Sequence, residues 1–126
     1  MRIAYVDTSC LVAIAFGEAG GAAMERRLSR FDELASSNLL EAELRASFAR
    51  EDVGVDAGFL NQVSWVLPDR ALGPEIIRVL GVGQLRGADL WHVACALYLA
   101  GDPTRISFLT FDRRQKEVAE GLGFVV

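Results

Sequence analysis

The sequence has few of the features that mark membrane or secreted proteins. Its longest unbroken apolar run, from Val93 to Ala100, has 8 residues, whereas a helix needs roughly 20 to cross a bilayer. The first residues, Met1 and Arg2, lead into a predicted strand and not into the apolar core of a signal peptide. We therefore expect a soluble, cytoplasmic protein that makes no contact with a membrane.

Cysteine and lysine are also scarce. Cys10 and Cys95 lie in apolar segments without C-x-x-C spacing, which argues against a disulfide framework or a cysteine zinc site. Lys116 is the single lysine among 13 basic residues, and the formal net charge is −4. An acidic chain is a poor general binder of polyanions. A nucleic-acid substrate would therefore need local arginines or bound cations.

The patterns that are present predict an α/β protein. With 126 residues, 52% of them hydrophobic, the chain suits a single domain over 1–126. Strand and helix patterns alternate, which favours a mostly parallel sheet. The predicted strands are 3–6, 33–36, 64–67, 106–110 and 123–126, and the predicted helices are 10–16, 20–31, 38–51, 56–63, 74–80, 88–100 and 112–121.

The first strand ends in a run of polar side chains. Residues 3–6 show no polar alternation, as expected of a central strand covered on both faces. Asp7, Thr8 and Ser9 follow at the edge where open α/β sheets bind ligands. Asp7 has a plainer explanation as the N-cap of the next helix, and taken alone the two readings are evenly matched.

A second acid, Glu43, lies on the core side of the helix predicted at 38–51. It falls inside the apolar arc that contains Leu40, Leu44 and Phe48, whereas Glu41 falls just outside and is assigned no role. A carboxylate on that side needs a partner or a shifted pKa. The partner would be either an arginine of the fold or a metal ion.

Two further acids occur at comparable places. Asp89 opens the apolar helix 88–100 and Asp112 follows the strand 106–110, where Thr110 supplies a hydroxyl. Each could simply stabilise a helix N-terminus. For His92, one turn after Asp89, we favour a packed, hydrogen-bonded role over a catalytic one. Four clustered carboxylates repel one another, and a hard cation such as Mg²⁺ or Mn²⁺ would offset that cost.

These segments together resemble the PIN domain and, more narrowly, the VapC-type toxins of bacterial toxin–antitoxin pairs. The resemblance covers nearly the whole chain and is most specific around Asp89 and Asp112. It is carried by Asp7-Thr8-Ser9, by Ser37 with Glu43-Leu44, by the run from Arg86 to Ala94, and by Leu109-Thr110-Phe111-Asp112.

The resemblance implies a three-layer α/β/α fold and a Mg²⁺- or Mn²⁺-dependent endoribonuclease. It places the acidic quartet on Asp7, Glu43, Asp89 and Asp112, with Asp7 and Asp89 closest to the metal. We expect Glu43 to bind through water or to orient the nucleophile. The hydroxyls of Thr8, Ser9 and Thr110 would then lie behind the metal-binding carboxylates and contact them directly or through water. The resemblance also implies an RNA substrate, a homodimer and a cognate antitoxin. Arg86, Arg113 and Arg114 are either phosphate contacts or simply solvated.

Three alternatives remain at this point. A phosphoacceptor receiver domain has about this length, but it should carry an acidic pair after the first strand and a lysine after the last. A phosphatase with an Asp-x-Asp nucleophile is disfavoured, because Asp7 is followed by Thr8 and Ser9. The third is a binding module that keeps the fold without activity, and the intact quartet argues against it.

Overall fold

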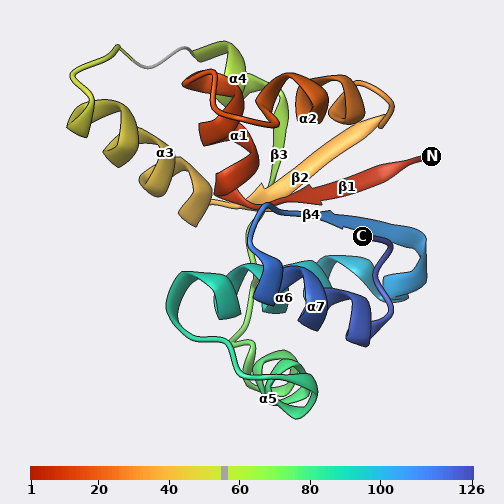
Figure 1. Ribbon diagram of the computed structural model, residues 1–126. Coiled ribbons are helices and arrows are strands. Elements are labelled where there is room, and N and C mark those ends of the chain that lie inside the picture. The colour runs from red at the N-terminus through yellow and green to blue at the C-terminus, as the bar shows by residue number, and fades with distance from the viewer. Residues whose placement is uncertain (55–56) are drawn as a thin grey trace.

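The protein is built around one parallel sheet of four strands. The computed structural model describes residues 1–54 and 57–126. The strands are ordered β3-β2-β1-β4, as Figure 1 shows. Ile3 of β1 lies opposite Glu33 of β2 and Ile106 of β4. The strand bounds are β1 Ile3–Val6, β2 Glu33–Ser37, β3 Val63–Val66 and β4 Ile106–Leu109.

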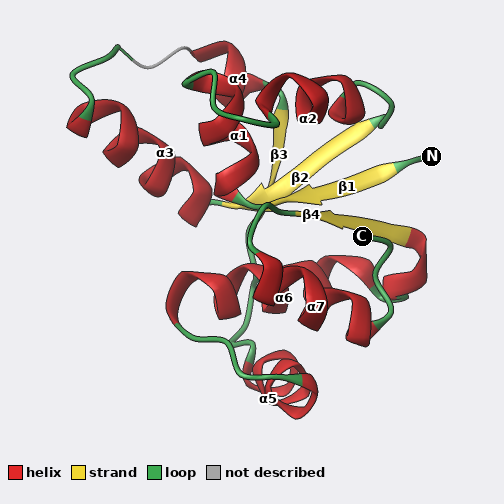
Figure 2. Ribbon diagram, viewed as in Figure 1, coloured by secondary structure: helices red, strands yellow, loops and turns green. Residues whose placement is uncertain are grey.

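Helices cover both faces of the sheet and give three layers. α1 to α4 lie on one face and α5 to α7 on the other, as Figure 2 shows. This arrangement confirms the predicted three-layer α/β/α fold. The helix bounds are α1 Thr8–Ala15, α2 Gly21–Leu28, α3 Leu39–Arg50, α4 Ala57–Asn61, α5 Gly73–Val82, α6 Gly87–Ala100 and α7 Arg113–Leu122, with a short 3₁₀ helix at Pro103–Arg105.

The two faces of β1 belong to two hydrophobic cores. Ala4 and Val6 pack with the α1–α4 layer, whereas Tyr5 packs with the α5–α7 layer and stacks on Phe108 at 5.3 Å between ring centroids. Side chains of a strand point alternately to its two faces. The sequence of a central strand is therefore an unbroken apolar run, and the carboxyl end of β1 is held between the two helix layers.

The most apolar helix, α6, is a buried element. Every residue from His92 to Leu97 is buried, which confirms the expectation from its nearly charge-free sequence. None of the helices in the described ranges is long and apolar enough to cross a membrane.

Several predicted boundaries are wrong. The helix predicted at 20–31 ends at Leu28, and the strand predicted at 64–67 ends at Val66. The predicted strand 123–126 is reduced to one parallel bridge between Val125 and Ser107. Gly123, at φ 107°, ends α7 with a turn, and of the segment that follows only Val125 forms a bridge to β4. The first helix begins at Thr8, not at residue 10. Of the helix predicted at 56–63, residue 56 lies outside the described residues, and Val63 instead pairs with Leu34 as part of β3.

Candidate active site

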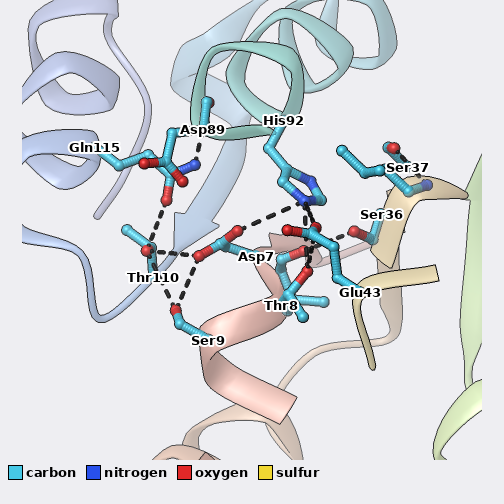
Figure 3. A network of polar contacts seen from close by, with 12 residues as sticks. Asp7, Thr8, Ser9, Ser36, Ser37, Glu43, Asp89, His92, Thr110 and Gln115 are labelled. Atoms are coloured by element: carbon cyan, nitrogen blue, oxygen red, sulfur yellow. Dashed lines mark hydrogen bonds and ion pairs between the residues drawn. The ribbon is translucent and has the colours of Figure 1, made fainter. Parts of the chain in front are cut away.

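The predicted site residues lie at the carboxyl edge of the sheet. β1 and β4 end side by side, so Asp7 and Thr110 follow neighbouring strands. The N-termini of α1, α6 and α7 reach the same edge, and Figure 3 shows the side chains that meet there. Parallel strands bring their carboxyl ends together, which is why residues far apart in sequence become neighbours.

Asp7 is buried and held by two hydroxyl groups. Its side chain is 8% exposed. Its Oδ2 accepts hydrogen bonds from Ser9 Oγ at 2.9 Å and Thr110 Oγ1 at 3.1 Å, and its Oδ1 lies 3.6 Å from His92 Nε2. The residue stands at the N-cap position of α1, but its side chain accepts no capping bond. The capping explanation therefore does not account for this carboxylate.

Glu43 is held through one oxygen. Its Oε1 accepts from Thr8 Oγ1 at 2.7 Å and from His92 Nε2 at 2.8 Å. The arginine partner considered from the sequence is not what holds it. Burial acts to raise the pKa of Glu43, but the hydrogen bonds from His92 and Thr8 and the charge of His92 lower it below its usual value. Glu43 is therefore kept as a carboxylate.

His92 is fully buried and bonded on both ring nitrogens. Nδ1 lies 2.8 Å from the hydroxyl of Tyr5, which in turn accepts a bond from the Ser37 backbone N–H at 3.0 Å. The expectation of a packed, hydrogen-bonded histidine agrees with this burial. The sequence reasoning missed Tyr5, although a tyrosine in a central strand needs a partner for its hydroxyl.

Asp89 is the member of the quartet with the least support from the protein. It is partly buried in the first turn of α6. Within the described ranges no hydrogen bond reaches its carboxylate, whereas its backbone carbonyl accepts one from Gln115 Nε2 at 3.2 Å. Burial, followed by the negative charges of Asp7 and Asp112, raises the pKa of Asp89 above its usual value. The like charges are thus close enough to act on each other.

Asp112 does cap a helix. Its Oδ1 accepts from the backbone N–H of Gln115 at 2.7 Å at the start of α7, and its own N–H donates to Thr110 Oγ1 at 3.0 Å. Gln115, missed from the sequence, is fully buried, and its Oε1 lies 2.7 Å from the Thr110 hydroxyl. It ties α7 to β4 and, through the carbonyl of Asp89, to α6. A glutamine in a polar helix carries no sequence signal for this role.

No arginine or lysine of the described chain forms an ion pair with any acid of the quartet. Arg113 pairs with Glu117 at 3.2 Å and Arg114 donates to the Gln84 carbonyl at 3.2 Å, while Arg86 is exposed at the N-cap of α6. The three arginines considered as phosphate contacts therefore lie on the surface near the site.

The donor set suits a hard divalent cation. In the described part of the chain, no three His, Cys, Asp or Glu side chains are already spaced as a complete ligand shell. The available donors are nevertheless carboxylate oxygens with uncompensated negative charge, which Mg²⁺ and Mn²⁺ prefer, with water filling the remaining positions.

Comparison with known proteins gives the family. Neither a search of curated proteins nor a search of solved structures gave a match. The PIN domain, however, matches residues 4–121. That span runs from β1 into the last turn of α7 and contains all four acids at the sheet edge. The chain therefore belongs to the PIN domain family, whose members are generally divalent-metal-dependent nucleases.

Proposed function

We propose that this protein is a metal-dependent endoribonuclease that hydrolyses RNA phosphodiester bonds and acts as the toxin of a VapC-type toxin–antitoxin pair. The observation that carries the proposal is the acidic quartet at the carboxyl edge of a PIN domain. Within the described residues no arginine or lysine pairs with these acids, and the one basic contact, His92, reaches Asp7 and Glu43 but neither Asp89 nor Asp112. Such a cluster costs stability unless a cation offsets it.

Asp7, Asp89 and Asp112 are the residues that would hold Mg²⁺ or Mn²⁺. The hydroxyls of Ser9 and Thr110 fix Asp7 Oδ2, so the carboxylate is oriented before any ligand arrives. A bound cation would supply positive charge to the phosphate oxygens and make hydroxide available from water near neutral pH.

Glu43 is the residue that would orient the attacking water. Its Oε1 is occupied by Thr8 and His92, and no hydrogen bond from the described residues reaches Oε2, which can accept one. In the reaction the water oxygen forms a bond to phosphorus and the bond to the leaving ribose oxygen breaks. The water gives up a proton and the leaving oxygen takes one up. Positioning the water in line with the leaving group is the contribution asked of Glu43.

RNA cleavage by the purified protein tests the proposal. The protein, stripped of metal and then given Mn²⁺, should cut single-stranded RNA and leave DNA of the same sequence intact. Asp7→Asn should abolish cleavage with the fold retained, because a neutral amide is a weak ligand for a hard cation. Glu41→Gln is the matched control, since Glu41 pairs with Arg45 at 2.8 Å in solvent. An Asp7→Asn protein that cuts at the wild-type rate would refute the site.

The proposed partners are a second copy of the chain and an antitoxin. The dimer is supported by large apolar side chains on the exposed face of α5, where Ile77 is 74% and Leu80 is 40% exposed. Light scattering at micromolar concentration should report a dimer, and Ile77→Glu should weaken it. A monomeric wild type would count against this part.

The antitoxin is supported by the uncompensated charge of the quartet, which an arginine of a partner would complement. Expression of the chain alone should arrest growth, and co-expression with the product of a neighbouring reading frame should relieve the arrest. Growth unaffected by the active nuclease would exclude the toxin role while leaving the ribonuclease in place.

A further inference from the structure

A chain of hydrogen bonds runs from the end of β2 to Glu43. It begins at the backbone N–H of Ser37, passes through the hydroxyl of Tyr5 and the ring of His92, and ends at Glu43 Oε1. The distances between successive heavy atoms are 3.0, 2.8 and 2.8 Å. Tyr5 and His92 are both fully buried, so water does not take part in their bonds.

The two ends of this chain fix its direction. A backbone N–H can only donate, so the Tyr5 oxygen accepts from Ser37. An ionised carboxylate can only accept, so His92 Nε2 must carry a proton toward Glu43. The remaining bond, between Tyr5 and Nδ1, is satisfied when the tyrosine hydroxyl donates. Tyr5 and His92 then each donate one hydrogen bond and accept one within this chain.

We propose that Tyr5 and His92 are positioning residues for Glu43. The Tyr5 hydroxyl donates to Nδ1, which selects the Nε2–H tautomer of His92, and that N–H holds Glu43 Oε1 in place. The hydrogen-bond assignment stands on the geometry alone, whereas its effect on catalysis rests on the proposed ribonuclease function.

The arrangement leaves Glu43 with one anchored oxygen, Oε1, and one oxygen, Oε2, that no other described residue contacts by a hydrogen bond. Thr8 and His92 approach Oε1 from α1 and α6, so a side chain on α3 is tied to two other elements. A glutamate loses considerable rotamer freedom when it is ordered, and these bonds meet that cost before substrate binds. Oε2 is then presented to a water in a fixed direction.

Tyr5→Phe removes a single oxygen from this chain. The ring can keep its stacking on Phe108, at 5.3 Å between centroids and 7° between planes. The lost hydroxyl leaves Nδ1 and the Ser37 N–H without their partner. Tyr98→Phe is the matched control, because the Tyr98 hydroxyl donates to Asp69 at 3.0 Å on the exposed end of the same helix as His92.

The first measurement is nitrogen NMR of the imidazole. His92 is the single histidine of the chain, so its two ring nitrogens are assigned without ambiguity. At pH 8 the wild type and Tyr98→Phe should show a protonated Nε2 and a bare Nδ1, and Tyr5→Phe should show a mixture of tautomers. A wild-type spectrum with the proton on Nδ1, or on both nitrogens, would overturn the assignment. That spectrum requires no variant, so a misfolded Tyr5→Phe cannot obscure it.

The second measurement separates positioning from general damage to the fold. Outer-shell partners of this kind typically change activity by roughly 10–100-fold. We expect Tyr5→Phe to lower kcat about tenfold, with the KM for RNA and the Kd for Mn²⁺ unchanged. In a Glu43→Gln background the same substitution should have little further effect, because residues that act through one another are not additive. Equal losses in both backgrounds would overturn the positioning role.

The two measurements fail independently. A wild type that cuts no RNA in Mn²⁺ would refute the proposed function, while the spectra of wild type and Tyr5→Phe would still decide the hydrogen-bond assignment. An active wild type with a spectrum of the wrong tautomer would refute the inference alone.

Discussion

Asp89→Asn should raise the stability of the metal-free protein and reduce the stabilisation that metal adds. The carboxylate of Asp89 accepts no hydrogen bond from the described residues, and its pKa is raised by burial and by the charges of Asp7 and Asp112. Its charged form is therefore less favourable in the folded protein than in the unfolded chain, and a neutral amide of the same shape removes that penalty.

The magnitudes follow from the size of the chain. Unfolding entropy of about 2.1 cal/mol/K per residue over 126 residues gives about 0.26 kcal/mol per degree. Relief of like-charge repulsion at a partly exposed site is worth about 0.5 kcal/mol after solvent screening, or about 2 °C. Mn²⁺ at a hundredfold excess over its Kd should stabilise the wild type by about 2.7 kcal/mol, or about 10 °C.

Glu41→Gln is the control for the helix dipole. Glu41 and Asp89 both lie in the first turn of a helix, α3 and α6 respectively, where an acid gains about 0.3–1 kcal/mol from the dipole. Glu41 has a solvent-exposed partner in Arg45 and no contact with the quartet. Its substitution should lower the melting temperature by about 2 °C and leave the Mn²⁺ increment unchanged.

Four melting curves for each protein provide the assay: with chelator or Mn²⁺, at pH 7 and near pH 4. The pH dependence follows from the pKa of Asp89, which is raised in the folded protein. The charge of Asp89 therefore destabilises the fold above that raised pKa, and this destabilisation vanishes as the pH falls toward 3.8, the ordinary pKa of the group. The advantage of Asp89→Asn in chelator should therefore disappear on acidification. A melting temperature lowered as much as in Glu41→Gln would show that Asp89 is only a helix-terminal acid. An unchanged Mn²⁺ increment would place the metal elsewhere.

Three other predictions concern single positions. Asp112→Asn should keep the cap of α7, whereas Asp112→Ala should cost about 1 kcal/mol, or about 4 °C; both should lose RNA cleavage, and equal melting temperatures would refute the cap. Gly21→Ala should cost about 2 kcal/mol, because its Cβ would meet the backbone carbonyl of Ala13, while Gly81→Ala in an open part of α5 should be neutral or stabilising by thermal melting. In chelator, Glu43→Gln should destabilise the protein at pH 7 and progressively less below pH 4.5. Because the pKa of Glu43 is lowered in the folded protein, its charge stabilises the fold above pH 4.5, and this stabilisation is lost as the pH falls through the folded pKa. A loss of stability that does not depend on pH would contradict this.

The sheet and its helices could be predicted because short runs of the sequence show how each element is buried. The unbroken apolar run of β1 and the charge-free sequence of α6 report burial on all sides, and both elements are buried as expected. The predicted strand at the C-terminus failed because β-branched residues alone do not fix pairing. The turn at Gly123 decides how much of the segment meets β4.

Asp7, Asp89 and Asp112 could be singled out from the sequence because they stand at a strand end or a helix start, positions that topology brings together, whereas Glu43 was singled out by its place in the apolar arc of α3. Their partners were not, because hydrogen bonds such as Tyr5 to His92 and Gln115 to the carbonyl of Asp89 join elements distant in the chain. No periodicity reports which hydroxyl reaches which ring. The arginine considered as a partner for Glu43 had the right charge, yet a histidine on the opposite layer was within reach.

The four acids divide into three whose carboxylates the described residues hydrogen-bond and one, Asp89, whose carboxylate they do not. Asp7 accepts two hydroxyl bonds, Glu43 accepts two bonds on one oxygen, and Asp112 caps α7. Each of these carboxylates is oriented by the fold itself. Asp89 is oriented only by its place in α6 and carries the cost of facing its neighbours. A cation entering the site would therefore gain most from Asp89 and would meet the other carboxylates already in position. The sign of the melting effect in chelator follows from that division, because Asp89→Asn should stabilise the protein whereas Asp112→Ala and Glu43→Gln should destabilise it.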